Sequence, residues 1–154
     1  MTDATSFERE VMQAVADHAC DLQAQGQDIV FTAAVIKDGK VVCHARNEVG
    51  DTDDVSRHAE VVAMAEASDR LATRDLSGAT LLASCQPCEM CLAAMRWARI
   101  DRVVFAAQKA NAGDAFFRFP GLEITDFQAA CDGGFAFVGG ICEDTVAHIY
   151  KDAS

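Results

Sequence analysis

The sequence predicts a three-layer α/β/α domain with a five-stranded mixed sheet. Its 154 residues fit a single domain that spans residues 1–154. Hydrophobic residues make up 51% and charged residues 24%, a composition that excludes a disordered chain and supplies a core. Runs typical of strands alternate with runs typical of helices. This alternation favours a mostly parallel sheet with helices on both faces.

The first third of the chain is expected to form a helix followed by a hairpin. Apolar residues recur at helical spacing over 3–25, and Gly26 ends that helix. Two runs rich in β-branched residues follow, at 29–36 and 41–45. Asp38-Gly39 between them is a strong turn signal, so we expect the two strands to pair antiparallel.

A polar, acidic loop is expected at 47–57. After it, predicted helices alternate with predicted strands. We expect helices at 58–73, 88–98 and 143–152, and strands at 79–84, 102–107 and 135–140. Residues 108–134 show no clear period, and the sequence leaves open whether they form a lid. Their aromatic residues are interpreted as core or dimer contacts, with a lid as the alternative: Phe116, Phe117 and Phe119.

The negative net charge limits the classes of molecule that the protein is expected to bind. Thirteen basic against 24 acidic residues give a formal net charge of −11. Nucleic-acid binders gain affinity by neutralising phosphates, so a nucleic-acid partner is not expected. No run approaches the ~18 apolar residues of a membrane span, and the polar start is unlike a secretion signal. We therefore expect a cytoplasmic protein.

Seven cysteines, an odd number, argue against a complete disulfide framework in such a chain. Four are scattered and are interpreted as small buried side chains: Cys20, Cys43, Cys131 and Cys142. The other three, Cys85, Cys88 and Cys91, are clustered. A cluster of cysteines in a reducing compartment indicates a metal site.

Two short fragments contain the candidate metal-binding and catalytic residues, and each lies at the start of a predicted helix. One is His58-Ala59-Glu60, and the other is Pro87-Cys88-Glu89-Met90-Cys91. Cys88 and Cys91 are three residues apart, so their sulfurs lie on one face of one helical turn. Thiolates are favoured at a helix N-terminus, and an imidazole completes three protein ligands for one Zn²⁺ per chain.

A fourth zinc position left open would hold the catalytic water, whose pKa falls to about 7. Glu60, two residues from His58, is placed to shuttle its proton. The alternative is a structural zinc site with a fourth protein ligand, for which Cys85, Cys43 and His44 are the candidates. Otherwise Cys85 is interpreted as part of the pocket wall.

His-x-Glu followed by Pro-Cys-x-x-Cys is the signature of zinc nucleobase deaminases. With the run at 84–99, it makes the chain resemble the cytidine deaminase superfamily, and within it the bacterial guanine deaminases. The resemblance implies a cytidine-deaminase-like fold and a homodimer. It also implies hydrolytic deamination of a small heterocyclic base, with guanine converted to xanthine and ammonia as the leading reaction.

The same resemblance implies five substrate-binding residues. Asn47 stands where the family binds the base, and Phe31 where it has an aromatic wall. Trp97 and Asp114 correspond to pocket residues of guanine deaminases. Tyr150 resembles a tail residue that closes the partner subunit's site through a swapped C-terminal segment.

Several substrates stay open at this point. Thr32 replaces an expected glycine, and the segment around Asp114 is short for a guanine deaminase. Cytosine, a nucleoside, a pterin or a triazine would undergo the same chemistry. A tRNA adenosine deaminase shares the motif, but the acidic charge weighs against it. The non-enzyme alternative is an inactive zinc module used for dimerisation.

Overall fold

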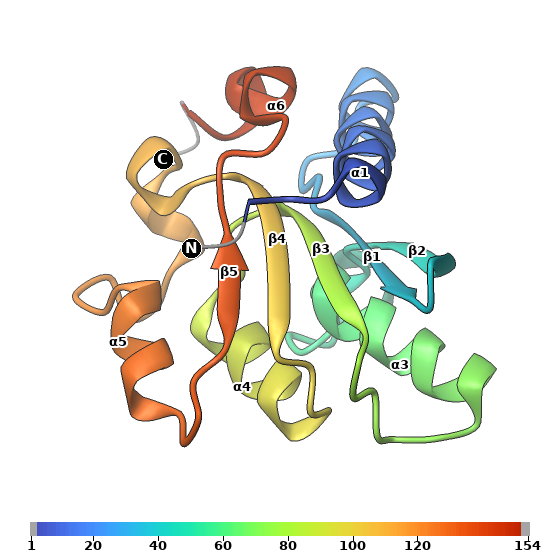
Figure 1. Ribbon diagram of the computed structural model, residues 1–154. Helices are drawn as coiled ribbons and strands as arrows, with labels where there is room; N and C mark the ends of the chain where they lie inside the picture. Colours follow the sequence, from blue (N-terminus) through green and yellow to red (C-terminus); the bar gives the residue numbers. More distant parts are fainter. Residues whose placement is uncertain (1–2, 152–154) are drawn as a thin grey trace.

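A single five-stranded sheet in the order β2-β1-β3-β4-β5 forms the centre of the protein (Figure 1). The computed structural model describes residues 3–151. The strands are β1 (Thr32–Lys37), β2 (Lys40–Arg46), β3 (Thr80–Cys85), β4 (Arg102–Ala107) and β5 (Ala136–Val138). The helices are α1 (Ser6–Ala24), α2 (Val49–Thr52), α3 (Ala59–Leu71), α4 (Glu89–Trp97), α5 (Ile124–Ala130) and α6 (Glu143–Tyr150).

The sheet is mixed, as predicted, but less parallel than the sequence indicated. β1 pairs antiparallel with both β2 and β3, whereas β3–β4 and β4–β5 are parallel. The expectation of one antiparallel pair was therefore wrong. The reason is that α3 connects β2 to β3, two strands of the same direction, while β1 lies between them and runs the opposite way.

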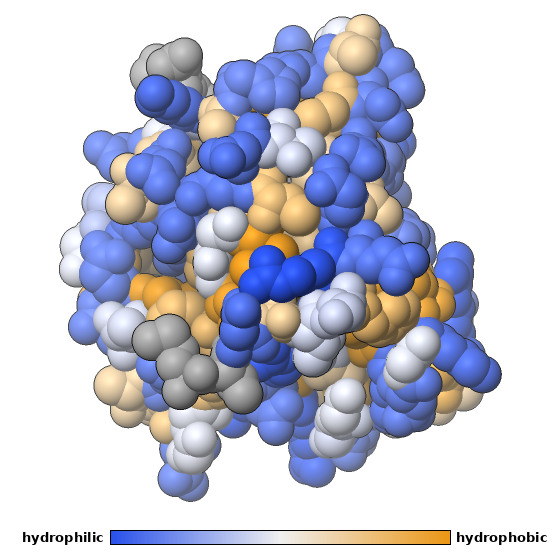
Figure 2. Space-filling model, turned by 45° about the horizontal axis from the view of Figure 1, so that its top comes forward, coloured by the Kyte–Doolittle hydropathy of each residue, from blue (hydrophilic) through white to orange (hydrophobic). Residues whose placement is uncertain are grey.

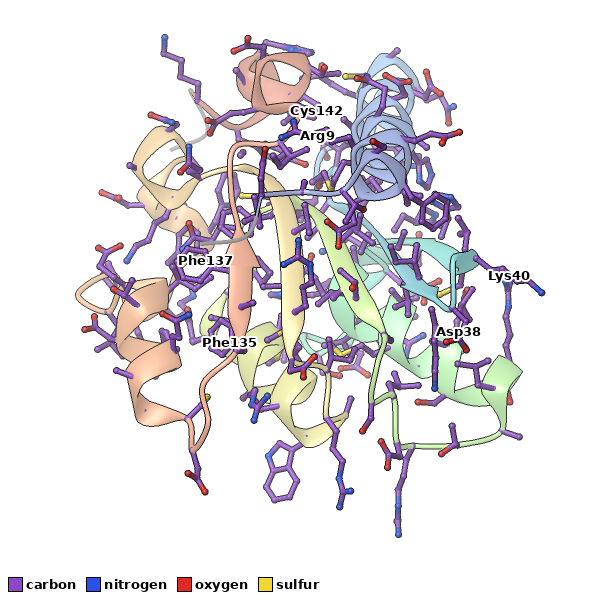
Figure 3. The ribbon with its side chains drawn as sticks, in the orientation of Figure 1. Arg9, Asp38, Lys40, Phe135, Phe137 and Cys142 are labelled. Atoms are coloured by element: carbon purple, nitrogen blue, oxygen red, sulfur yellow. The ribbon has the colours of Figure 1, made fainter. Side chains whose placement is uncertain are left out.

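The hairpin between β1 and β2 forms at the predicted turn. Asp38 and Gly39 both have positive φ, 53° and 72°. These values are those of the type I′ turn that Asp-Gly favours. Figure 3 shows Asp38 and Lys40 at the tip of this hairpin. The first strand begins only at Thr32, so Ile29 and Phe31 lie before it rather than within it.

Two helical layers cover the sheet, one on each face. Alternate residues of the strands point to opposite sides. Val35, Leu81 and Val103 join the apolar cluster beneath α3, α4 and α5. The neighbouring apolar residues, such as Leu82 and Val104, join the cluster beneath α1 and α6. Figure 1 shows α1 and α6 beside each other on one side and α3 and α4 on the other, which confirms the three-layer prediction.

The segment without a clear period contains three short helical elements. Two are single 3₁₀ turns, η1 (Lys109–Asn111) and η2 (Asp114–Phe116), and the third is α5. Lys109 organises the loop between them, because its Nζ donates to the carbonyls of Pro120 (2.8 Å) and Leu122 (2.7 Å). Hydrogen bonds from a side chain to distant backbone carbonyls leave no regular spacing in the sequence. The pattern of apolar residues therefore did not reveal this loop.

The surface agrees with the acidic, polar composition. Figure 2 shows hydrophilic side chains over most of the face that carries α1 and α6, with hydrophobic side chains between them. Within residues 3–151, every helix is too short or too polar to cross a lipid bilayer.

Candidate active site

The N-termini of α3 and α4 meet at one end of the sheet and bring three potential metal ligands together. His58 is the N-cap of α3, and Cys88 is the N-cap of α4. Cys91 lies in the first turn of α4 and is fully buried. Cys88 Sγ is 3.4 Å from His58 Nδ1 and 3.7 Å from Cys91 Sγ, and Cys91 Sγ is 3.6 Å from His58 Nδ1.

This triangle has the dimensions of a tetrahedral zinc site. Zn–S bonds of about 2.3 Å and Zn–N bonds of about 2.0–2.1 Å place two sulfurs about 3.8 Å apart and sulfur and nitrogen about 3.6 Å apart. All three observed distances agree with these values to within about 0.2 Å, the tolerance for a real site. His58, Cys88 and Cys91 thus fit zinc and leave its fourth position free.

The groups around the two cysteines favour the thiolate form of Cys88, which is the form that binds a cation. The pKa of Cys88 is lowered to about 4, first by a hydrogen bond from the Cys91 thiol and also by a hydrogen bond from His58. The hydrogen bond that His58 makes to Cys88 in turn raises the pKa of His58. The pKa of Cys91 is raised because its proton is held by the Cys88 thiolate. Metal binding would release that proton.

Glu60 is a buried carboxyl group beside the triangle. It lies in the first turn of α3, is 5% exposed, and lines the cavity that His58 and Cys88 also line. Burial raises its pKa to about 7. A carboxyl group with a pKa near neutrality exchanges protons readily at physiological pH, as a general acid or base must.

A structural zinc site is not supported by the described residues. Among residues 3–151, only His58, Cys88 and Cys91 form a group with metal-ligand geometry. Cys85 lies in the cavity wall, and burial raises the pKa of its thiol. Cys43 instead donates to the Ala63 carbonyl at 3.2 Å. The fourth position is therefore available to water.

The cavity in front of the triangle has a volume of about 610 Å³. Its wall is largely apolar, with a few polar groups, which is typical of a small-molecule site. Two residues expected at the substrate are there, Phe31 and Asn47. The Asn47 Oδ1 accepts from the Val49 N–H at 2.9 Å, so its amide NH₂ is the group left to donate to a ligand.

Three other residues expected at the substrate lie outside the lining of this chain's own cavity. Trp97 is 88% exposed at the far end of α4. Asp114 is exposed in η2, one residue before the cavity-lining Ala115. Tyr150 is buried behind Phe31. In this single chain α6 packs on α1, and the swap of the C-terminal segment with a partner subunit stays a prediction.

Sequence reasoning missed several residues of the cavity. Gln86 accepts from the Lys109 N–H at 2.9 Å and so fixes the start of the following loop. Phe116 and Arg118 come from that loop, and Ile29 from the segment before β1. The position of Gln86 between two of the clustered cysteines was the only local signal, because the other residues reach the cavity through tertiary structure alone.

The larger part of the sequence, residues 5–107, matches a known family. The pattern described as the cytidine and deoxycytidylate deaminase zinc-binding region matches residues 5–107. These residues include the whole metal triangle, Glu60, Phe31 and Asn47.

Individual relatives act on different substrates. A guanine deaminase of Bacillus subtilis is 37% identical over 99 residues, which cover 64% of each chain. Its structure gives a TM-score of 0.65 at 30% identity, covering 79% of this chain and 75% of that one. A tRNA-specific adenosine deaminase of Aquifex aeolicus is 39% identical over 80 residues, 52% of this chain and 53% of the other. The chain thus spans less than two thirds of these curated relatives.

A structure from a study of tRNA:A34 deaminases gives a TM-score of 0.74 at 27% identity. It covers 90% of this chain and 96% of that one. The fold is therefore shared with a guanine deaminase and with a structure from a study of tRNA:A34 deaminases.

Proposed function

The chain belongs to the cytidine and deoxycytidylate deaminase zinc-binding family, and from this premise we propose that it is a zinc-dependent aminohydrolase that converts guanine and water to xanthine and ammonia. The observation that carries the proposal is the position of Glu60. Its buried carboxyl group lines the same cavity as His58 and Cys88, beside an aromatic wall.

His58, Cys88 and Cys91 would hold the zinc ion. Bound zinc lowers the pKa of a coordinated water to about 7 and so makes a nucleophile available at neutral pH. Glu60 would accept a proton from the attacking water and deliver it to a ring nitrogen of the substrate, while the water oxygen bonds to the amine-bearing carbon. Glu60 would then carry the remaining hydroxyl proton to the amine, so that the C–N bond breaks as the ring carbonyl forms. Ammonia leaves, and the carboxyl group returns to its starting state.

Phe31 and Asn47 supply the binding surface for a flat ring. Phe31 offers an aromatic face, and the Asn47 amide can donate to a ring nitrogen or carbonyl. The match to the guanine deaminase covers 64% of this chain, against 52% for the tRNA-specific adenosine deaminase of similar identity, and this longer match supports guanine as the substrate. The net charge of −11 disfavours a polyanionic tRNA, whose phosphates need neutralisation.

The test is ammonia release by the zinc-loaded protein with guanine, cytosine, adenine, cytidine, guanosine and ammeline. We expect turnover of guanine above all others. Turnover of a different compound would refute guanine as the substrate but would support hydrolytic deamination as the reaction. Release of ammonia from none of them, together with conversion of adenosine in tRNA, would favour the tRNA reaction of the Aquifex relative. No reaction on either panel would favour the inactive zinc module.

A further inference from the structure

Tyr150 lies directly behind the aromatic wall of the cavity without reaching the cavity itself. It is 1% exposed at the end of α6. Its ring is stacked on Phe31, with centroids 5.2 Å apart and planes 9° from parallel. Phe31 lines the cavity, whereas Tyr150 is absent from its lining. Phe31 thus lies between Tyr150 and the space for the substrate.

The hydroxyl of Tyr150 fixes the backbone on both sides of Phe31. It donates to the Val30 carbonyl at 2.6 Å and lies 2.7 Å from Ser84 Oγ. Because its single proton goes to Val30, the Ser84 hydroxyl must donate to the Tyr150 oxygen. Ser84 Oγ in turn accepts from the Thr32 N–H at 3.0 Å. One buried network therefore holds the residues before and after Phe31.

Tyr150 also contacts the second wall of the cavity. Phe116, which lines the cavity, packs edge-on against Phe31 (5.0 Å, 88°) and against Tyr150 (6.1 Å, 89°). The backbone carbonyl of Tyr150 accepts from the Gly113 N–H at 3.2 Å, just before η2. The C-terminal helix therefore reaches two walls that are 85 residues apart in sequence, at residues 31 and 116.

We propose that Tyr150 is a positioning residue that holds Phe31 and Phe116, which meet edge-to-face, as two adjoining preformed sides of an aromatic slot for the substrate ring. This role rests on the proposed function. The contacts reach neither the metal triangle nor Glu60, so the slot contributes to binding of the ring rather than to proton transfer. A slot that is already ordered lowers the entropic cost of binding a flat ligand.

The test is Tyr150→Phe, which keeps the stacked ring and removes both hydroxyl hydrogen bonds. For guanine we expect KM to rise on the order of three- to tenfold, with kcat within about twofold, because one or two hydrogen bonds of ordinary strength are lost from the wall and not from the reacting groups. Ser84→Ala removes a link of the same network. It should shift KM in the same direction, and the double variant should shift KM by less than the product of the two effects.

The matched control is Val146→Ala, a fully buried residue of the same helix that lies outside the cavity lining. It should lower the melting temperature and leave KM unchanged. An unchanged KM in both Tyr150→Phe and Ser84→Ala, or an equal rise in Val146→Ala, would overturn the positioning role.

Calorimetric titration of guanine into the zinc-loaded Glu60→Gln protein separates this proposal from the proposed function. Absence of both guanine turnover and guanine binding refutes guanine as substrate, and the slot with it. If guanine binds and Tyr150→Phe in the Glu60→Gln background weakens that binding, the slot is supported whatever the wild type hydrolyses. If guanine binding is insensitive to Tyr150→Phe, only the slot fails.

Discussion

At the scale of single residues, the proposed activity should depend most on Glu60. Glu60→Gln keeps the size of the side chain and removes its ability to accept a proton. We expect turnover to fall by about 10²- to 10⁴-fold, the usual contribution of a general acid–base group. Zinc content should stay the same, because His58, Cys88 and Cys91 alone form the metal-binding group among residues 3–151. Ammonia release and metal analysis of the same samples measure both quantities.

The control for this substitution is Glu66→Gln, on the same helix but outside the cavity lining. It should retain full activity. If Glu60→Gln turned over substrate at the wild-type rate, another group would have to move the proton. Loss of zinc would show instead that Glu60 supports the metal site.

The sequence predicted the metal triangle because the two cysteines are local neighbours and the His-x-Glu and Pro-Cys-x-x-Cys fragments together form a known signature. Cys88 and Cys91 share one helical turn, and His58 opens a second helix next to Glu60. Trp97 shows the limit of such reasoning. It lies nine residues after Cys88, and a rise of about 1.5 Å per residue places it roughly 13 Å along α4, away from the site. A similar position in sequence did not make it a neighbour of the metal.

At the scale of elements, an ion pair links the start of α1 to the start of β4. Glu8 is 4% exposed, and its carboxylate accepts from Arg102 Nε at 2.7 Å and from Arg102 Nη2 at 2.9 Å. The same carboxylate accepts from the Thr5 N–H at 2.9 Å in a capping box. Bonds from Arg102 hold the pKa of Glu8 below its usual value, despite burial.

Glu8→Gln should therefore cost about 2–3 kcal/mol in the free energy of unfolding at pH 7, as expected for charge-assisted hydrogen bonds. The folded-state pKa of Glu8 is lower than the unfolded one. Its contribution is present above the unfolded pKa, about 4.3, and is lost as the pH falls through the folded value. The difference in unfolding free energy between the wild type and Glu8→Gln, measured by urea denaturation, should accordingly become smaller in acid. Glu10→Gln, exposed on the same helix, should show no such difference at either pH.

The segment 108–134 depends on a half-buried lysine. Lys109→Met removes the two bonds from Nζ to the Pro120 and Leu122 carbonyls and the cation that lies 5.4 Å from the Phe117 ring centre. We expect faster amide exchange and faster proteolysis over residues 112–123, with little change in the sheet. Lys40→Met, at the exposed hairpin tip, is the control. Equal exchange in both variants would mean that the Lys109 ammonium group does not hold the loop.

The fold was predictable where apolar residues follow a period. The hairpin turn at Asp38-Gly39 and the alternation of helices with strands are examples. The antiparallel pairing of β1 with β3 was not, because Ala33 and Ala83 meet across 50 residues of chain. No local pattern specifies which strand lies beside which. The loop that Lys109 organises was missed because its side chain bonds to backbone carbonyls 11 and 13 residues away, which leave no periodic pattern in the sequence.

At the scale of the whole molecule, the metal site joins two helices that lie on the same side of the sheet. His58 begins α3, while Cys88 and Cys91 begin α4, and the apolar cluster beneath both helices is continuous. The core is extensive without the metal, so the zinc-free chain should stay folded. Zinc should nevertheless stabilise it, because ligands that bind the folded state alone shift the equilibrium by mass action.

Removal of zinc with a chelator should therefore lower the melting temperature and keep the far-ultraviolet circular dichroism. The lost stability should approach about 4 kcal/mol when free zinc had stood about a thousandfold above its Kd. Cys88→Ser should melt near the zinc-free wild type and gain little from added zinc. Complete unfolding on chelation would instead make the metal the organising centre of the fold. An unchanged melting temperature would mean that the triangle does not hold zinc in solution.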